Sequence, residues 1–225
     1  MDADSMMYVT DRLKSAGVPV NARLWTTSRA VELWDPRTPL QRDKWNAAAA
    51  DKMDAEHLAF TKNKLSHNKW VMLCGKVGRG KTAWATGHFS DIVAERINRN
   101  EHWGSKRSPI WVTEAALFRK AEARSHDGYH GRSVYLNGLI TCPILLLDDL
   151  GGNRRTLTNW QGGAMRDLLS ERHANLRTTI ITTNIETWDE VEKRYGDHIV
   201  SRLIEACGVM VRIDGPDRRI NVREV

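Results

Sequence analysis

The stretch Gly75–Thr82 reads GKVGRGKT and stands directly after the apolar run Trp70–Cys74, WVMLC. Its three glycines let the backbone curl, so that several N–H groups converge on phosphate oxygens. From Lys81 onward, apolar residues recur at close to helical spacing, so the positive end of a helix dipole joins the loop. A strand, a glycine-rich loop and a helix in this order are the context that a phosphate-binding loop requires. The sequence therefore predicts a P-loop here.

ATP and Mg²⁺ are the ligands that this loop is expected to bind. The Lys81 ammonium can reach the β- and γ-phosphates, and the Thr82 hydroxyl can ligate Mg²⁺. The predicted contacts with the nucleotide come from the whole loop, namely Gly75, Lys76, Val77, Gly78, Arg79, Gly80, Lys81 and Thr82.

A second motif, Ile144–Gly151, reads ILLLDDLG. An apolar strand that ends in two carboxylates is the Walker B arrangement. We expect Asp148 to hold Mg²⁺, often through water, and Asp149 to polarise the attacking water. Helix capping is the alternative for paired acids, and the apolar run directly before them argues against it. Residues 83–143 leave room for an intervening strand–helix unit, as a βαβ topology needs.

Two further polar residues, Asn184 and Arg202, are candidates for the site. The β-branched run TTIITT ends at Asn184, whose amide can sit beside the γ-phosphate and orient water. An asparagine at a strand end is also a common turn residue. The segment Tyr195–Ala206 reads YGDHIVSRLIEA and is expected to place Arg202 on a helix. For such an arginine, a surface ion pair is the ordinary alternative.

Strands and helices alternate from residue 70 onward, which predicts an α/β chain with a mostly parallel sheet and helices on both faces. The stretch SHDGYHG, residues 125–131, has the composition of a loop. The expected strands are 70–74, 110–112, 144–147, 178–183 and 209–213. The expected helices are 8–16, 81–98, 114–124, 160–174, 188–195 and 198–206, and residues 41–65 also have a helix-favouring composition.

The charge balance favours an anionic partner, nucleic acid above all. The chain of 225 residues carries a formal net charge of +6 and has a pI near 9.4. Two segments combine excess positive charge with glycine-rich flexibility, as a loop that tracks phosphates would. The predicted contacts with single-stranded DNA are Arg124, Arg132, Arg154 and Arg155. A solvated charged loop is the alternative for both segments.

Several other classes of protein are disfavoured. Cys74, Cys142 and Cys207 are far apart and never in CxxC spacing, so neither a disulfide framework nor a zinc site is expected. His126 and His130 stand four residues apart without a third ligand in view. The first residues lack the pattern of a signal peptide, and no apolar run approaches the roughly 20 residues of a membrane span. We therefore expect a cytoplasmic protein with no membrane partner.

Together these residues resemble the AAA+ ATPases of the bacterial helicase-loader group, the DnaC/IstB-like family. The resemblance runs from about Val18 to Arg219 and is strongest in GKVGRGKT, LLLDDLGG, SERHANLRTTIITTN and IVSRLIE. It implies a five-stranded AAA+ core with no lid domain, or a minimal one, over residues 18–225. Residues 1–17 would form a short N-terminal segment. The family binds ATP, assembles through its ATP sites into rings or helical oligomers, and binds single-stranded DNA.

The resemblance also implies roles for three residues. Asn184 matches the sensor 1 position, and Arg202 matches the arginine finger. Arg219, in GPDRR, lies near a late family motif that usually reads Gly-x-Ser-Tyr-Arg, and it is expected to contact the nucleotide despite the imperfect match. Cellular helicase loaders carry a separate N-terminal domain that grips the helicase. Here residues 1–17 precede the core, so helicase docking must use that segment, use another surface, or be absent.

Three functions are compatible with these patterns. The leading hypothesis is an ATP-dependent helicase loader of DNA replication, with a replicative helicase and single-stranded DNA as partners. The alternatives are a transposition helper ATPase that recruits a transposase, and a nucleotide-dependent switch that binds a protein without binding DNA. A kinase of small metabolites is disfavoured, because the acidic strand end, Asn184 and Arg202 suit hydrolysis between subunits.

Overall fold

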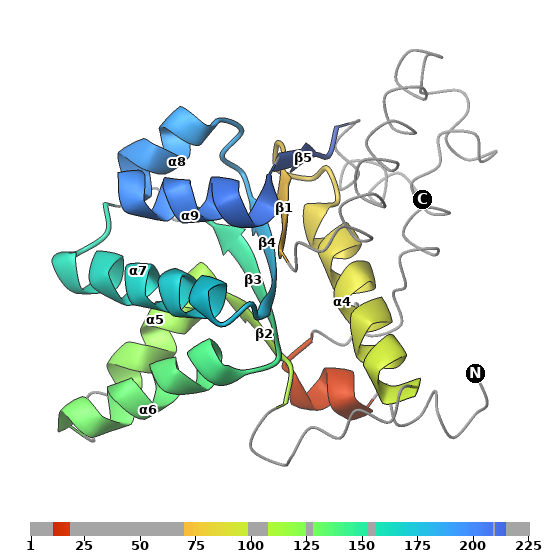
Figure 1. The fold of residues 1–225 in the computed structure, drawn as a ribbon, viewed down its shortest axis with the longest axis horizontal. Helices are drawn as coiled ribbons and strands as arrows, with labels where there is room; N and C mark the ends of the chain where they lie inside the picture. Colours follow the sequence, from red (N-terminus) through yellow and green to blue (C-terminus); the bar gives the residue numbers. More distant parts are fainter. Residues whose placement is uncertain are drawn as a thin grey trace, which may run out of the picture.

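A parallel five-stranded sheet covered by helices on both faces forms the centre of the molecule (Figure 1). The computed structural model describes residues 11–18, 70–98, 108–124, 128–152, 156–208 and 210–214. The strand order is β2-β3-β4-β1-β5, and every pairing is parallel. The strands are β1 Trp70–Cys74, β2 Ile110–Thr113, β3 Ile144–Leu150, β4 Thr178–Thr183 and β5 Met210–Arg212.

The helices occupy nearly the segments that the sequence predicts. Their bounds are α4 Lys81–Asn98, α5 Glu114–Ala123, α6 Gly128–Thr141, α7 Asn159–Ala174, α8 Trp188–Tyr195 and α9 Asp197–Cys207. Residues 11–15 are also helical. The expected helical composition of residues 41–65 lies outside the described residues, as does any lid after residue 214.

Helix α6 is the main departure from the predicted elements. The stretch 128–131 was expected to be part of a loop, but it begins this helix. Three glycines and a mixed polar pattern make α6 a weak helix on local grounds. Its packing compensates, because Leu139 in its last turn and Cys142 directly after it are buried in the main core. Tertiary contacts therefore decide the conformation here.

Successive side chains along a strand point to opposite faces of the sheet and belong to two separate hydrophobic cores. Trp70 and Met72 point to the face covered by α5, α6, α7, α8 and α9, whereas Val71 and Leu73 point to the face covered by α4. This arrangement explains why β1 is apolar at every position, because a parallel strand covered on both faces has no side that contacts water.

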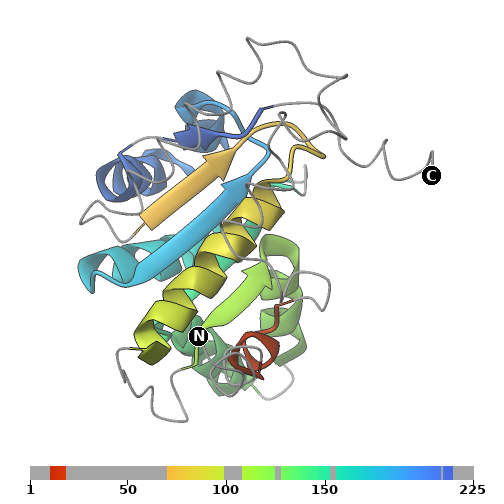
Figure 2. The same ribbon diagram turned by 90° about the vertical axis from the view of Figure 1, so that its right-hand side faces the viewer.

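The described part of the N-terminal segment packs on the α4 face beside β2 (Figure 2). Leu13, Ala16 and Val18 are each at most 3% exposed. The Trp111 N–H donates to the Ala16 carbonyl at 2.7 Å, so residue 16 adds a backbone hydrogen bond to the edge of the sheet. The expected boundary between residues 17 and 18 stays a prediction.

A buried arginine ties three elements together on the other face. Arg172 of α7 is fully buried, and its guanidinium donates to the Leu139 and Cys142 carbonyls at 2.7 and 2.9 Å. It also donates to the Thr179 hydroxyl at 3.0 Å. The carbonyls at the end of α6 carry the negative end of its helix dipole, so a cation is favoured there. Arg172 thereby fixes α6 and α7 against β4.

The three cysteines are buried free thiols. Burial raises the pKa of Cys207 to about 12, and it also raises the pKa of Cys142. In the part of the chain that the structure describes, no helix is both long enough and apolar enough to cross a lipid bilayer.

Candidate nucleotide-binding site

The glycine-rich loop lies between β1 and α4, at the carboxyl edge of the sheet (Figure 1). Gly75, Gly78 and Gly80 have φ angles of 137°, 81° and 93°, a region that favours glycine. A Cβ atom at Gly75 would also lie 2.4 Å from the carbonyl oxygen of Ile213. The loop therefore has the curled backbone of a phosphate cradle, and its first glycine has no room for a side chain.

Two oxygen donors suited to Mg²⁺ meet beside the loop. The Thr82 hydroxyl, at the start of α4, donates to Oδ1 of Asp148 at 3.0 Å. The Thr182 hydroxyl donates to the same oxygen at 2.6 Å. Hydroxyl and carboxylate oxygens are the hard ligands that Mg²⁺ prefers, so this pair fits the ion.

Asp148 is only 5% exposed, and burial raises the pKa of its carboxyl group. Hydrogen bonds from Thr182 and Thr82 oppose this rise, because they stabilise the ionised form. The neighbouring negative charge of Asp149 adds to it. A divalent cation would remove the cost of this buried charge.

A second chain of contacts links the loop to Asp149 through Asn184. The Lys81 ammonium donates to Oδ1 of Asn184 at 2.7 Å, and Nδ2 of Asn184 donates to Oδ1 of Asp149 at 2.8 Å. Lys81 also donates to the carbonyl of Lys76 at 2.8 Å. The amide satisfies both neighbours in this orientation alone, since the ammonium only donates and the carboxylate only accepts.

The two adjacent acids differ because the strand is irregular between them. The register of β3 against β4 shifts between Leu147 and Leu150, and Asp149 has a left-handed φ of 56°. The backbone N–H of Asp149 donates to the Thr182 hydroxyl at 2.9 Å. As a result, Asp148 faces inward to the threonines, whereas the Asp149 carboxylate is exposed beside Asn184.

Sequence reasoning missed two residues that support this site. Thr182 contacts both Asp148 and Asp149. In the sequence, however, nothing distinguishes it from the other β-branched residues of the strand TTIITT. Glu114 accepts a hydrogen bond from the Gly151 N–H at 2.9 Å. By pattern it is an ordinary acid in the first turn of a helix. Their importance follows from the strand order, which places β2, β3 and β4 side by side and cannot be read from the sequence.

Arg202 lies on α9, where its guanidinium is 3.2 Å from Oε2 of Glu205. Both side chains are about half exposed, at 49% and 59%. This is the surface ion pair that was the alternative reading of the residue. The pair lies within α9 and does not join Arg202 to Lys81, Asp149 or Asn184.

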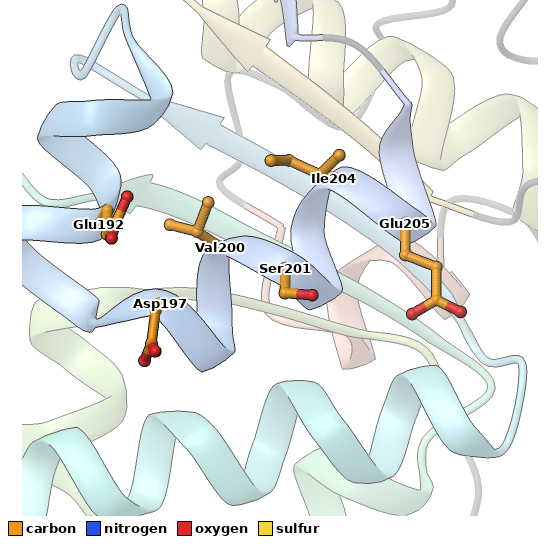
Figure 3. Close-up of a pocket in the computed structure, with 6 residues that line it drawn as sticks. All are labelled: Glu192, Asp197, Val200, Ser201, Ile204 and Glu205. Atoms are coloured by element: carbon orange, nitrogen blue, oxygen red, sulfur yellow. The ribbon is translucent and has the colours of Figure 1, made fainter.

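A groove of about 530 Å³ is lined by residues of α9 and the end of α8 (Figure 3). Ile204, 42% exposed, and Val200 form its apolar part, and carboxylates stand around them. The residues that line it are Glu192, Asp197, Val200, Ser201, Ile204 and Glu205. The helix that carries Arg202 therefore presents an apolar patch with an acidic border.

Of the four arginines predicted to contact DNA, the structure describes Arg124 and Arg132. Arg124 lies 4.6 Å from the ring centre of Tyr135, and Arg132 lies 4.3 Å from that of Trp160. Trp160 is in the first turn of α7, shortly after residues 153–155. Arg154 and Arg155 lie outside the described residues, and so does Arg219.

Comparisons with known proteins give a likeness in structure alone. No protein-family model and no curated protein sequence matches the chain. The DnaC helicase loader matches with a TM-score of 0.58 and 19% identity, over 76% of this chain and 92% of that one. DnaI matches with a TM-score of 0.52 and 20% identity, over 81% and 91%.

The replication initiator DnaA, bound to AMPPCP and single-stranded DNA, also matches. Its TM-score is 0.52 and its identity 16%, over 80% of this chain and 52% of that one. The chain therefore shares the fold of these helicase-loader and initiator structures. The predicted α/β class and five-stranded parallel core are confirmed.

Asp148→Asn is expected to raise the melting temperature at neutral pH in the absence of Mg²⁺. The folded-state pKa of Asp148 is raised, so stability is lost as pH rises through that value and the buried carboxyl ionises. The asparagine stays neutral, and its amide oxygen still accepts from both threonines. The difference in melting temperature between the variant and the wild type should therefore shrink as pH falls toward the ordinary pKa of aspartate.

Thermal melts in EDTA across about pH 4 to 8 measure this difference. Asp167→Asn, an exposed change on α7, is the control and should leave the melting temperature unchanged. Adding Mg²⁺ and nucleotide should stabilise the wild type and not the Asp148 variant. A variant that melts below the wild type at neutral pH in EDTA contradicts the prediction.

Proposed function

We propose that this chain is an ATP-hydrolysing helicase loader of DNA replication, which assembles with copies of itself and binds single-stranded DNA. The observation that carries the ATPase part is the continuous contact from Lys81 through Asn184 to Asp149, beside the Thr82–Asp148 pair. The likeness to the DnaC and DnaI folds supports a loader over a transposition helper. Pull-down with a purified replicative helicase or a transposase distinguishes the two.

Different residues of the site would bind the phosphates, hold Mg²⁺ and activate water during phosphoryl transfer. The loop N–H groups and Lys81 would hold the phosphates of ATP, while Thr82 and Asp148 would hold Mg²⁺. The bound ion supplies charge neutralisation at the phosphate oxygens. Asp149 is exposed beside the loop and would orient a water and take its proton. Asn184 would fix the spacing between Lys81 and this base, since it contacts both.

Asp149→Asn and Lys81→Ala should fail at different steps. The amide of Asp149→Asn keeps the size of the side chain but cannot accept a proton, so ATP should bind while turnover falls by about 10²–10⁴-fold. Lys81→Ala removes the cation that faces the β- and γ-phosphates, so tight ATP binding should be lost.

Titration with a fluorescent ATP analogue and measurement of phosphate release separate these outcomes. Hydrolysis at the wild-type rate in Asp149→Asn would assign the base to another residue. Normal nucleotide affinity in Lys81→Ala would show that the loop does not bind phosphate.

We also propose that Arg202 completes the ATP site of a neighbouring copy. It stands on the exposed face of α9 and pairs with Glu205, which lines the groove, as a residue at a subunit interface would. Arg194 of the adjacent helix α8 is less suited to this role, because its side chain is 13% exposed and lies 3.4 Å from Glu114 in its own subunit. An arginine finger contributes roughly 10³–10⁵ in rate.

Mixing two inactive variants tests the shared site. Arg202→Ala should bind ATP, because its own loop is whole, but should not hydrolyse it. Mixing it with Lys81→Ala should restore part of the activity, because an intact loop then meets an intact arginine. Arg166→Ala, an exposed change on α7, should behave as the wild type. Activity of Arg202→Ala alone, or no rescue despite proven co-assembly, speaks against this role.

Single-stranded DNA is proposed to bind near Arg124, Arg132 and the segment that holds Arg154 and Arg155. Arg132 stacks on Trp160, which follows that segment closely in sequence, so cation and aromatic ring stand together. Phosphate-binding cations next to aromatic rings are the usual components of a surface for single strands. The net charge of +6 agrees with such a partner.

Removing these cations should weaken the salt dependence of DNA binding. For single strands each lost phosphate contact lowers the slope of log K against log salt by about 0.7, so the double change of Arg124 and Arg132 to Gln should lower it by about 1.4. The same double change at Arg154 and Arg155 should act similarly. Fluorescence anisotropy with a labelled oligonucleotide measures the slope, with Arg166→Gln as control. Unchanged slopes in both double variants would remove the DNA assignment.

A further inference from the structure

Glu114 is a buried carboxylate whose described hydrogen bonds go to other elements and not to the backbone of its own helix. It is the first residue of α5 and is 2% exposed. The N-terminus of α5 is capped by Thr113, whose hydroxyl accepts from the Ala116 N–H at 3.1 Å. The side chain of Glu114 instead reaches two other elements, so its burial calls for an explanation outside helix capping.

The first of these elements is the turn that carries Asp149. Oε2 of Glu114 accepts from the Gly151 N–H at 2.9 Å. Gly151 has a φ of 75°, and the Gly152 N–H closes the turn by donating to the Asp149 carbonyl at 3.0 Å. Asp149 itself is held in a left-handed conformation that costs about 1–3 kcal/mol for a residue other than glycine. The turn therefore needs outside contacts to keep its shape.

The second element is the end of α8. The Tyr195 hydroxyl donates to Oε1 of Glu114 at 2.7 Å, and the Arg194 guanidinium lies 3.4 Å from Oε2. Burial raises the pKa of Tyr195, so the phenol stays protonated and keeps donating. Gly196, with a φ of 87°, joins α8 directly to α9. Glu114 thus bridges the Asp149 turn and the helix pair that bears Arg202.

Gly151 is packed tightly inside this junction. A Cβ at this position would lie 2.6 Å from Cδ1 of Ile185 and 3.6 Å from Cδ of Arg194. Ile185 follows Asn184 directly, so the residue that contacts Asp149 and the residue that packs on Gly151 are neighbours. A shift of α8 against Gly151 would therefore move the Asp149 carboxylate relative to Asn184.

We infer that Glu114 is a positioning residue for ATP hydrolysis, which holds the Asp149–Gly152 turn against α8 and so sets the place of the proposed base. Glu114 touches neither the glycine-rich loop nor the carboxylate of Asp149 in the described contacts, so it acts through the turn. The inference rests on the proposed ATPase function. The buried pair of Glu114 and Arg194 would then contribute to the rate of ATP hydrolysis as well as to stability.

Graded substitutions separate this role from a purely structural one. Glu114→Gln keeps a single acceptor oxygen, so it can face the Gly151 N–H or the Tyr195 hydroxyl but not both. Tyr195→Phe removes one donor and leaves the carboxylate. Each should lower kcat by roughly tenfold, and Glu114→Leu by roughly a hundredfold, since small misplacements of a reacting group cost that much. KM and nucleotide affinity should stay within about twofold, because the loop is untouched. Glu171→Gln, exposed on α7, is the matched control.

Amide hydrogen exchange of the Asp149–Gly152 turn gives a readout that does not depend on activity. We expect exchange to accelerate about tenfold or more in Glu114→Gln and Tyr195→Phe, with exchange of residues 75–82 unchanged. Unchanged exchange of the turn, wild-type kcat in both variants, or an equal fall in nucleotide affinity would overturn the inference. A wild-type protein without ATPase activity would instead refute the proposed function, and the exchange data would still decide whether Glu114 holds the turn.

Discussion

The position of β4 between β1 and β3 is the constraint on which the candidate site depends. In a parallel sheet the carboxyl ends of neighbouring strands meet at one edge, so the residues after β1, β4 and β3 stand in a row. The loop before Lys81 follows β1, Asn184 follows β4, and Asp149 lies at the end of β3. Asn184 therefore stands between the cation and the acid and can contact both, at 2.7 and 2.8 Å.

The break in register between β3 and β4 then gives two adjacent acids separate environments. In a regular strand, one residue would face each side of the sheet. Here the backbone turns at Asp149, and Thr182 receives its N–H while donating to Asp148. One hydroxyl thus fixes both acids. The buried acid is suited to a cation, and the exposed one is suited to water.

The parts of this arrangement that follow from local pattern were predictable from sequence. The glycine-rich loop, the apolar strand before Asp148 and the β-branched strand before Asn184 each carry their signal within a few residues. Helix α6 has no such signal, because its burial against α5 and α7 outweighs three glycines. Thr182 and Glu114 were missed for another reason. Their contacts cross from one strand end to the next, and they depend on which strands are neighbours.

The energetics of the two arginines on α8 and α9 favour different roles for them. Arg202 pairs with Glu205 at the surface, and breaking such a pair costs about 0.2–1 kcal/mol. An arginine finger lowers a barrier by roughly 4–7 kcal/mol, which is the equivalent of 10³–10⁵ in rate. If it acts as the proposed finger, Arg202 would therefore lose little by leaving Glu205 and would contribute much more to the rate at the neighbouring site. Removing Arg194 from Glu114 would leave a buried carboxylate short of a donor, at a cost of about 3–5 kcal/mol. That cost offsets most of the gain, so Arg194 is better suited to hold the Asp149 turn than to serve a neighbouring copy.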